Sequence, residues 1–276
     1  MPLVKVRGDV SLYVEDTGKS GKPVVFIHGW PLSQQIFEYQ FMQLHREGYR
    51  CVGIDLRGFG RSDKPWSGYV YDTFAGDIEG VMTALDLHDA TLVGFSMGGA
   101  IARRYAARYL PSDRVSGVVF MSAAAPCFTK REDFPHGLEK SDCDNLIAQS
   151  LKDRAKMVAD FAKIFFRNED SQSKELKDWL FSINMQASLY STVKCLEELR
   201  DADLRADMQR INEKKLPVAI FHGTKDRICP FDLAEAMNEG IKGSKLVAFG
   251  NSEHGLNIEE KEKANEQLIK FAEAPR

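Results

Sequence analysis

The sequence predicts an α/β fold, in which a mostly parallel sheet of eight strands is flanked by helices and interrupted by an inserted helical cap. Two observations predict it. Short β-rich runs alternate with longer helical stretches, a pattern that implies a parallel sheet covered by helices. Several of the short runs are also apolar throughout, as expected for strands that are buried on both faces.

Each predicted strand is indicated by its own composition. The first two form a hairpin, because the pair Gly8-Asp9 between them is a turn signal. The later ones are short, largely apolar runs, which is typical of strands inside a sheet. In chain order the predicted strands are 3–6, 11–15, 24–27, 51–54, 91–93, 115–121, 216–221 and 245–249.

The helices are predicted from periodicity and from residues that begin or end them. Ser33 can cap a helix that starts at the next residue, and Gly48 can end it. The stretch that begins at Thr73 has apolar residues at helical spacing. Outside the cap, the predicted helices are 34–47, 73–85, 100–109 and 259–271.

The strand signals stop in the middle of the chain, over residues 126–215. This segment is charge-rich and helical in character, and its apolar residues are spaced to form one buried face. Because the sheet pattern resumes directly afterwards, we interpret 126–215 as a helical cap inserted into a core domain formed by 1–125 and 216–276. The alternative is an independent helical domain.

Composition narrows the function classes. A net charge of −3 over 276 residues gives no electrostatic reason to expect nucleic acid or an anionic membrane as a partner. No apolar run approaches the roughly 20 residues that span a bilayer, and the first ten residues do not resemble a secretory signal. The five cysteines form no C-x-x-C pair. We therefore expect a cytoplasmic protein, and association into a homo-oligomer stays open.

The segment Leu92–Ala100 carries the strongest functional signal. Its letters are Leu-Val-Gly-Phe-Ser-Met-Gly-Gly-Ala, so an apolar run meets a serine flanked by glycines and a helical stretch follows at once. That is the strand–turn–helix setting of a G-x-S-x-G nucleophile elbow. Ser96 is therefore the candidate nucleophile.

A serine nucleophile needs a base, and the base needs a carboxylate to orient it. His254 follows the last predicted strand, and Asp226 follows the strand before it. The chain order Ser–Asp–His, with each residue just beyond a strand, is the order of the α/β hydrolases. Asp55 also follows a strand, but it precedes Ser96 and ranks below Asp226.

Acyl transfer also needs two N–H donors for the negative oxygen of the transition state. One is expected to be the backbone N–H of Met97, at the start of the helix. The other should come from the loop after the strand 24–27, where Trp30 is the natural donor. Pro31 is excluded from this oxyanion hole because proline has no backbone N–H.

Other polar groups have structural interpretations. His28 and His222 each precede a glycine and are expected to brace loops. The loop 55–63 is expected to be structural, with an internal Asp–Arg pair, because it lacks the phosphate-binding pattern. Since the histidines of the site lie in different loops without paired carboxylates or thiolates, neither a metal nor a cofactor is expected.

With these residues placed, the chain closely resembles the cofactor-free (non-haem) haloperoxidase branch of the α/β hydrolases, which includes aryl esterases, perhydrolases and some γ-lactamases. The resemblance covers essentially the whole chain. The segments that carry it are Phe26–Leu32, Asp55–Ser62, Tyr71–Phe74, Leu92–Gly99 and His222–Asp226.

This resemblance implies the triad Ser96, Asp226 and His254 and ester hydrolysis through an acyl-enzyme. It also implies perhydrolysis, in which hydrogen peroxide replaces water and the released peracid oxidises halide without haem or metal. Perhydrolytic members are similar to this chain in having a proline where Pro31 stands. Its fixed φ would turn the carbonyl of Trp30 toward bound peroxide. The alternative is that Pro31 only shapes its loop.

The resemblance says least about the substrate. Small carboxylic esters, with hydrogen peroxide and short carboxylic acids as further partners, are what it implies. Together with Pro31, residues that match the acyl or alcohol pocket of relatives are Phe128, Phe161, Phe165 and Ile228. As aromatic and aliphatic side chains these could equally form the core of the cap.

Two further functions stay open as alternatives. The chain could be a γ-lactamase or amidase, or a binding protein of the hydrolase fold with little turnover.

One residue departs from the pattern of the branch. Glu253 stands directly before His254, where the family more often has a small or apolar residue. A carboxylate at that position would favour the protonated form of the base.

Overall fold

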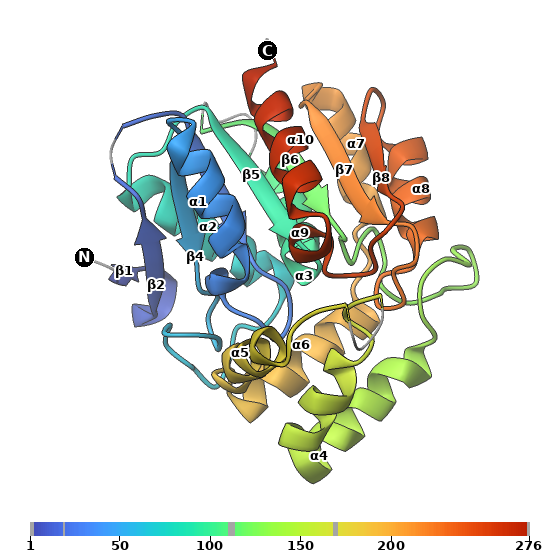
Figure 1. Ribbon diagram of the computed structural model, residues 1–276. Coiled ribbons are helices and arrows are strands. Elements are labelled where there is room, and N and C mark those ends of the chain that lie inside the picture. The colour runs from blue at the N-terminus through green and yellow to red at the C-terminus, as the bar shows by residue number, and fades with distance from the viewer. Residues whose placement is uncertain (1–2, 19, 110–113, 168–170, 275–276) are drawn as a thin grey trace.

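The computed structural model describes residues 3–18, 20–109, 114–167 and 171–274. These residues form an eight-stranded sheet with helices around it (Figure 1). The strand order is β1-β2-β4-β3-β5-β6-β7-β8. β1 and β2 pair antiparallel, β2 pairs antiparallel with β4, and the strands from β3 to β8 are parallel. The predicted fold class is thereby confirmed. The strands are β1 Leu3–Lys5, β2 Ser11–Asp16, β3 Pro23–Ile27, β4 Arg50–Ile54, β5 Ala90–Phe95, β6 Val115–Met121, β7 Val218–Gly223 and β8 Lys245–Phe249.

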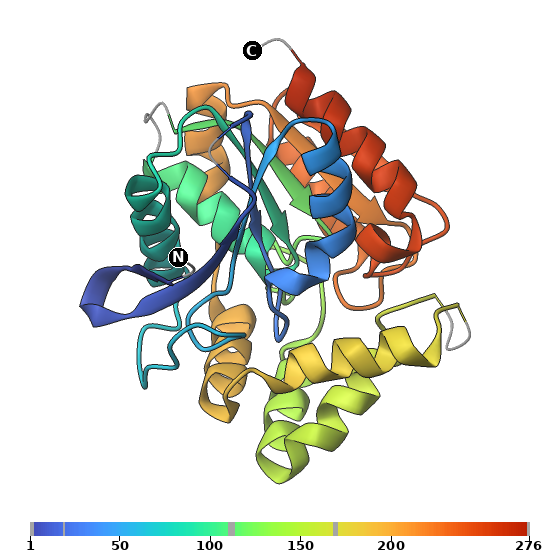
Figure 2. The same ribbon diagram turned by 60° about the vertical axis from the view of Figure 1, so that its left-hand side comes forward.

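Helices cover both faces of the sheet (Figures 1 and 2). α1 and α10 pack together on one face, and α2, α3 and α7 lie on the other. The helices of these layers are α1 Glu38–Arg46, α2 Tyr71–Ala84, α3 Met97–Tyr109, α7 Arg205–Lys214, α8 Phe231–Gly240, α9 Leu256–Glu259 and α10 Lys261–Glu273. The predicted final helix, 259–271, corresponds to α10, and the short helix α9 precedes it.

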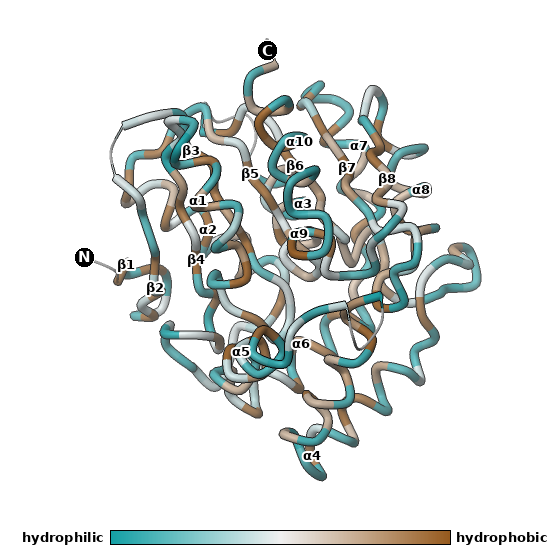
Figure 3. Tube along the Cα trace, in the orientation of Figure 1, coloured by the Kyte–Doolittle hydropathy of each residue, from teal (hydrophilic) through white to brown (hydrophobic). Residues whose placement is uncertain are grey.

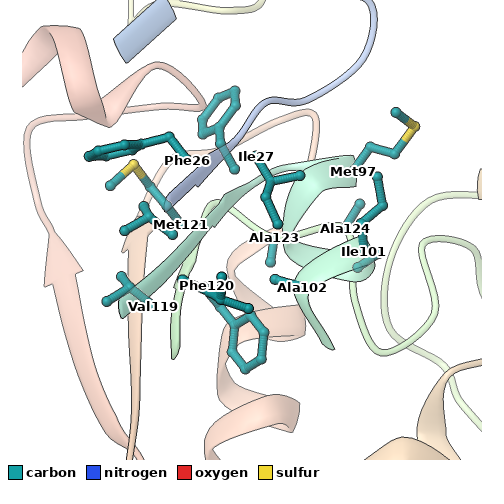
Figure 4. Packing of buried hydrophobic residues seen from close by; sticks show 14 of the residues in the cluster. Phe26, Ile27, Met97, Ile101, Ala102, Val119, Phe120, Met121, Ala123 and Ala124 are labelled. Atoms are coloured by element: carbon teal, nitrogen blue, oxygen red, sulfur yellow. The ribbon is translucent and has the colours of Figure 1, made fainter. Parts of the chain in front are cut away.

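The core lies between these layers because the central strands are apolar on both faces. All residues of β4 and β5 are buried, and the interior strands are hydrophobic along their length (Figure 3). Figure 4 shows side chains of neighbouring elements gathered where β5 passes into α3, among them Phe26, Val119 and Ile101. This packing holds the tip of β5, where the candidate nucleophile stands.

Ser33 and Gly48 stand at the two ends of the first helical segment, as predicted. The Ser33 side chain accepts a hydrogen bond from the backbone N–H of Gln35, so it caps a 3-10 turn over Gln34–Phe37 that continues into α1. Gly48 follows α1 with φ +86°, a conformation that glycine adopts without steric cost.

Three helices lie beyond the carboxyl ends of the parallel strands: α4 Lys140–Ala162, α5 Lys174–Met185 and α6 Leu189–Asp201 (Figures 1 and 2). They pack on one another, whereas α7 packs on α3 in the layer that covers the sheet. The chain leaves and rejoins this layer at one place, since the N–H of Leu204 donates to the carbonyl of Pro126 at 2.9 Å. Of the predicted cap, α4 to α6 therefore stand apart from the sheet.

The loop after β4 is structural, but its internal Asp–Arg pair was a wrong prediction. Asp55 accepts hydrogen bonds from the backbone N–H groups of Gln34 and Arg61. Arg57 instead forms a buried, two-pronged ion pair with Asp77 of α2, at 2.6 and 2.7 Å. The carboxylate satisfies loop donors, and the guanidinium ties the loop to the helix layer.

A membrane-crossing helix was not expected from the sequence. None of the helices in the described ranges has both the length and the apolar character that crossing a bilayer requires.

Candidate active site

Ser96 stands on a sharp turn between β5 and α3. Its φ of +55° lies in the left-handed region, which is uncommon for residues other than glycine and costs conformational energy. Neighbouring backbone groups hold the turn: its N–H donates to the carbonyl of Met121, and its carbonyl accepts from the N–H of Gly99 and of Ala124. The side chain is therefore fixed at the carboxyl edge of the sheet.

Two glycines allow the loop after β3 to lie directly against this turn. A Cβ on Gly98 would lie 2.1 Å from the carbonyl oxygen of Ile27, and a Cβ on Gly29 would lie 2.7 Å from the Cβ of Ser96. Real Cβ atoms do not approach other atoms so closely. Larger residues would push apart the segments that hold Ser96 and Trp30.

Asp226 and His254 meet at the ends of β7 and β8. Asp226 Oδ2 lies 2.8 Å from His254 Nδ1, and its Oδ1 accepts hydrogen bonds from the backbone N–H groups of Ile228 and Cys229. Burial alone would raise the pKa of Asp226, but His254, His222 and the N–H of Cys229 hold that pKa below its ordinary value. The carboxylate is therefore ionised and faces the imidazole.

A second histidine packs beside this carboxylate. His222 is fully buried, its Nε2 donates to the carbonyl of Cys229 at 2.7 Å, and it lies 3.5 Å from Asp226 Oδ2. Its Nδ1 has no hydrogen-bond partner in the described part of the chain. Burial lowers the pKa of His222 despite the nearby carboxylate, so the ring is neutral near pH 7. It braces the loop, as the sequence suggested.

His28 also braces a loop. Its Nε2 accepts the N–H of Leu56 at 3.0 Å, and its Nδ1 donates to the carbonyl of Gly29 at 2.7 Å. These two bonds connect the loops that follow β3 and β4. Burial lowers the pKa of His28, which keeps the ring neutral and able to accept.

The His254 ring is held by aromatic neighbours. Phe95 and Phe165 lie with ring centroids 4.9 and 5.4 Å from the imidazole, and Ser122 Oγ donates to the His254 carbonyl. Among the described residues, no hydrogen bond joins Ser96 to His254. Such contacts are often long in a free enzyme and tighten when substrate binds.

The two expected oxyanion donors have unoccupied N–H groups. Neither the backbone N–H of Trp30 nor that of Met97 donates to an acceptor within the described ranges. The Trp30 indole is anchored separately, because its Nε1 donates to the carbonyl of Thr192 on α6 and its ring packs edge-on against Phe161. The peptide between Trp30 and Pro31 is cis.

A narrow pocket opens between the β3 loop and the cap helices. Trp30, Pro31, Phe161 and Phe165 all contribute to its wall. Two other residues expected there, Phe128 and Ile228, are buried but do not line it. The structure therefore brings together three of the five predicted pocket residues.

The sequence did not single out Asn184, which lines the same pocket from α5. It follows Leu180 and Ile183 at the spacing of one helix face, so a polar residue in an apolar stripe was the available signal.

Cys229 was also missed as a neighbour of the site. Its thiol lies beside the Ser96 hydroxyl and is fully buried, and burial raises its pKa well above the ordinary value. The thiol is therefore protonated and a poor nucleophile.

Glu253 is engaged by another residue. Arg227 Nε and Nη2 each lie 2.8 Å from the Glu253 carboxylate. This ion pair offsets the negative charge that the sequence places next to His254.

Taken together, a sharp turn carries a hydroxyl, a carboxylate orients an imidazole at the next strand ends, and two N–H groups have no acceptor in the described part of the chain. Such a set can perform nucleophilic acyl transfer without any bound group.

Comparison with known proteins gives the same class. A model of the alpha/beta hydrolase fold family matches residues 22–261. The AB hydrolase superfamily protein YisY of Bacillus subtilis is 48% identical over 269 residues, which are 98% of each chain. A non-heme chloroperoxidase of Kitasatospora aureofaciens is 32% identical, over 98% of this chain and 99% of its own. The solved structure of an esterase from Exiguobacterium antarcticum superposes with a TM-score of 0.94 at 42% identity, over 99% of both chains.

Proposed function

The chain is an enzyme that belongs to the alpha/beta hydrolase fold family, in the branch of the non-haem haloperoxidases and esterases, and from this premise we propose that it is a serine hydrolase of small carboxylic esters. The observation that supports this most is the pairing of Asp226 with His254 beside a serine on a strained turn. A strained, glycine-flanked serine without such a pair would be only a tight turn.

In the proposed reaction Ser96 Oγ attacks the ester carbonyl and its proton passes to His254 Nε2. Asp226 stabilises the imidazolium that forms, and the N–H groups of Trp30 and Met97 donate to the oxyanion. The alcohol leaves with the proton from His254, and an acyl group remains on Ser96. Water then attacks this acyl-enzyme, with His254 as the base, and releases the acid.

Perhydrolysis is the second activity that we propose. Hydrogen peroxide would attack the same acyl-enzyme in place of water and leave as a peracid. Two observations favour it: Pro31 forms part of the pocket wall next to Trp30, and a relative over the full length is named a chloroperoxidase. If Pro31→Ala left the ratio of peracid to acid unchanged, Pro31 would only shape its loop.

The test of ester hydrolysis uses p-nitrophenyl acetate. We expect a burst of p-nitrophenol equal to the enzyme concentration or steady turnover, blocked by a fluorophosphonate and absent in Ser96→Ala. Ser182→Ala, at an exposed serine on α5, is the matched control and should react like the wild type. Binding of esters with no turnover would instead identify a binding protein.

We also place this enzyme in the cytoplasm. All five cysteines are unpaired and buried, which suits a reducing compartment. A predominantly periplasmic or extracellular location in a fractionation experiment would contradict this.

A further inference from the structure

The pocket beside the candidate active site is lined mostly by apolar side chains. Trp30, Phe161, Phe165 and Leu180 supply aromatic and aliphatic surface, whereas Asn184 and Lys177 enter from α5. Phe165 also packs on the His254 ring, so the pocket adjoins the residues that would carry the reaction.

The amide oxygen of Asn184, Oδ1, is buried without a hydrogen-bond partner in the described part of the chain. Only 5% of the residue is exposed. An unpaired buried carbonyl oxygen is costly, since it loses its bonds to water and gains none from the protein. Leucine has nearly the same size and would remove that cost. A buried polar atom whose hydrogen bonds the protein does not complete is expected where a ligand completes them.

The size of the pocket limits that ligand. The volume open to the centre of a water molecule is only about 20 Å³, which is room for one water. A water bound to the amide could be displaced without loss by a ligand group that makes the same hydrogen bonds. A hydroxyl fits this description, because it both donates and accepts and therefore matches either end of an amide.

Resting on the proposed ester hydrolysis, we propose that Asn184 selects esters that carry a hydroxyl group on the part that enters this pocket. The hydroxyl takes the space of that one water and pairs with the amide. An ester with a methyl group in the same position leaves the amide unpaired. Sites built around a polar group reject the analogue that lacks it more strongly than apolar sites reject an added group.

The test compares esters that differ only by hydroxyl against methyl. Suitable pairs are the p-nitrophenyl esters of 3-hydroxybutanoate and 3-methylbutanoate, those of 2-hydroxypropanoate and 2-methylpropanoate, and, on the alcohol side, 2-hydroxypropyl and 2-methylpropyl acetate. For each pair the ratio of kcat/KM is measured in the wild type and in Asn184→Leu. Dividing one ratio by the other cancels the intrinsic reactivity of the two esters.

We expect at least one pair to show a ratio about tenfold higher in the wild type than in Asn184→Leu. The position of the hydroxyl in that pair would tell which part of the ester enters the pocket. Leu180→Met changes the same wall without a polar group and should alter both members of each pair equally. Asn184→Ala gives the same comparison if the leucine variant does not fold.

The outcomes separate this inference from the proposed function. Equal ratios in the wild type and both Asn184 variants, with the methyl esters hydrolysed, would overturn the role of Asn184 and leave ester hydrolysis standing. No hydrolysis of any ester in the panel, p-nitrophenyl acetate included, would overturn the proposed function itself.

Discussion

Asp226 Oδ2 lies 2.8 Å from Nδ1 of His254, and neither side chain is more than 2% exposed. Because the carboxylate accepts, Nδ1 carries the proton and Nε2 is left as the acceptor that faces the site. The other carboxylate oxygen is occupied by two backbone N–H groups. The pair therefore fixes both the tautomer and the orientation of the ring.

Asp226→Asn should remove most of the activity. An amide can present its NH₂ to the ring, which favours the wrong tautomer, and it cannot stabilise the imidazolium. We expect kcat for p-nitrophenyl acetate to fall by about 10³–10⁴-fold with little change in KM. Asp232→Asn is the matched control, because that carboxylate pairs with His136 outside the site. A loss below tenfold in Asp226→Asn would show that another group orients the base.

His222 should make the protein less stable in mild acid. Its pKa is ordinarily 6.5 and is lowered in the folded state, chiefly by burial. Below pH 6.5 the unfolded chain therefore binds a proton that the folded chain refuses, and the free energy of unfolding decreases as the pH falls. The contribution of this group is fully present above its unfolded pKa and is lost by up to about 1.4 kcal/mol per pH unit below it.

Urea unfolding of the wild type and of His222→Gln at pH 7, 6 and 5 measures this effect. The glutamine amide can still donate to the Cys229 carbonyl but does not titrate. We expect a smaller loss of stability between pH 7 and pH 5 in the variant, whatever its stability at pH 7. Curves that stay parallel over this range would mean that His222 is not charged on unfolding, or is already charged when folded.

The two glycines Gly98 and Gly76 should respond in opposite ways to alanine. A Cβ on Gly98 would meet a backbone oxygen at 2.1 Å, whereas a Cβ on Gly76, inside α2, would meet the Tyr109 hydroxyl at 3.4 Å and Arg7 Cδ at 4.0 Å, which are ordinary contact distances. Gly76→Ala should raise the free energy of unfolding by about 0.5–1 kcal/mol, because alanine favours the helix. Gly98→Ala should lower it by about 1–3 kcal/mol and reduce esterase activity. Denaturant unfolding and steady-state rates check both, and retained activity in Gly98→Ala would contradict the close contact.

The strands and the triad residues could be predicted from the sequence because their signals lie in short, local stretches of the chain. The run 24–27 is apolar at every position, and this composition alone predicts a strand that is buried on both faces. Ser96, Asp226 and His254 were found because each follows a strand, and parallel strands bring their carboxyl ends to one edge. These signals need only strand ends and chain order.

Contacts between layers could not be predicted in this way. Arg57 pairs with Asp77 because α2 lies against the loop. The spacing of charged residues within the loop does not indicate where α2 lies. The packing of α7 on α3 likewise depends on how the chain returns from the cap. The role of Asn184 depends on which face of α5 turns toward Trp30, a tertiary fact that helical periodicity alone does not contain.

The Arg103 side chain is expected to lower the free energy of unfolding of the wild-type protein. It is fully buried in α3, and none of its three guanidinium nitrogens has a hydrogen-bond partner in the described ranges. Burial lowers its pKa to about 10 although Asp207 lies nearby. Replacing a buried charge that makes no hydrogen bond by an apolar side chain of similar length removes the desolvation cost, so Arg103→Met should raise the free energy of unfolding by about 1–4 kcal/mol.

The neighbouring Arg104 provides the contrast. Its Nε lies 3.1 Å from Asp207 Oδ2, an ion pair without hydrogen-bond alignment. Arg104→Met would leave the buried Asp207 carboxylate without that cation, and we expect it to lower the free energy of unfolding by about 3 kcal/mol. Urea denaturation of both variants at pH 7 measures the two effects in one α3 background. If Arg103→Met instead lowered the free energy of unfolding, an ordered anion or water cluster would have to bind the Arg103 guanidinium in the folded protein and compensate its charge.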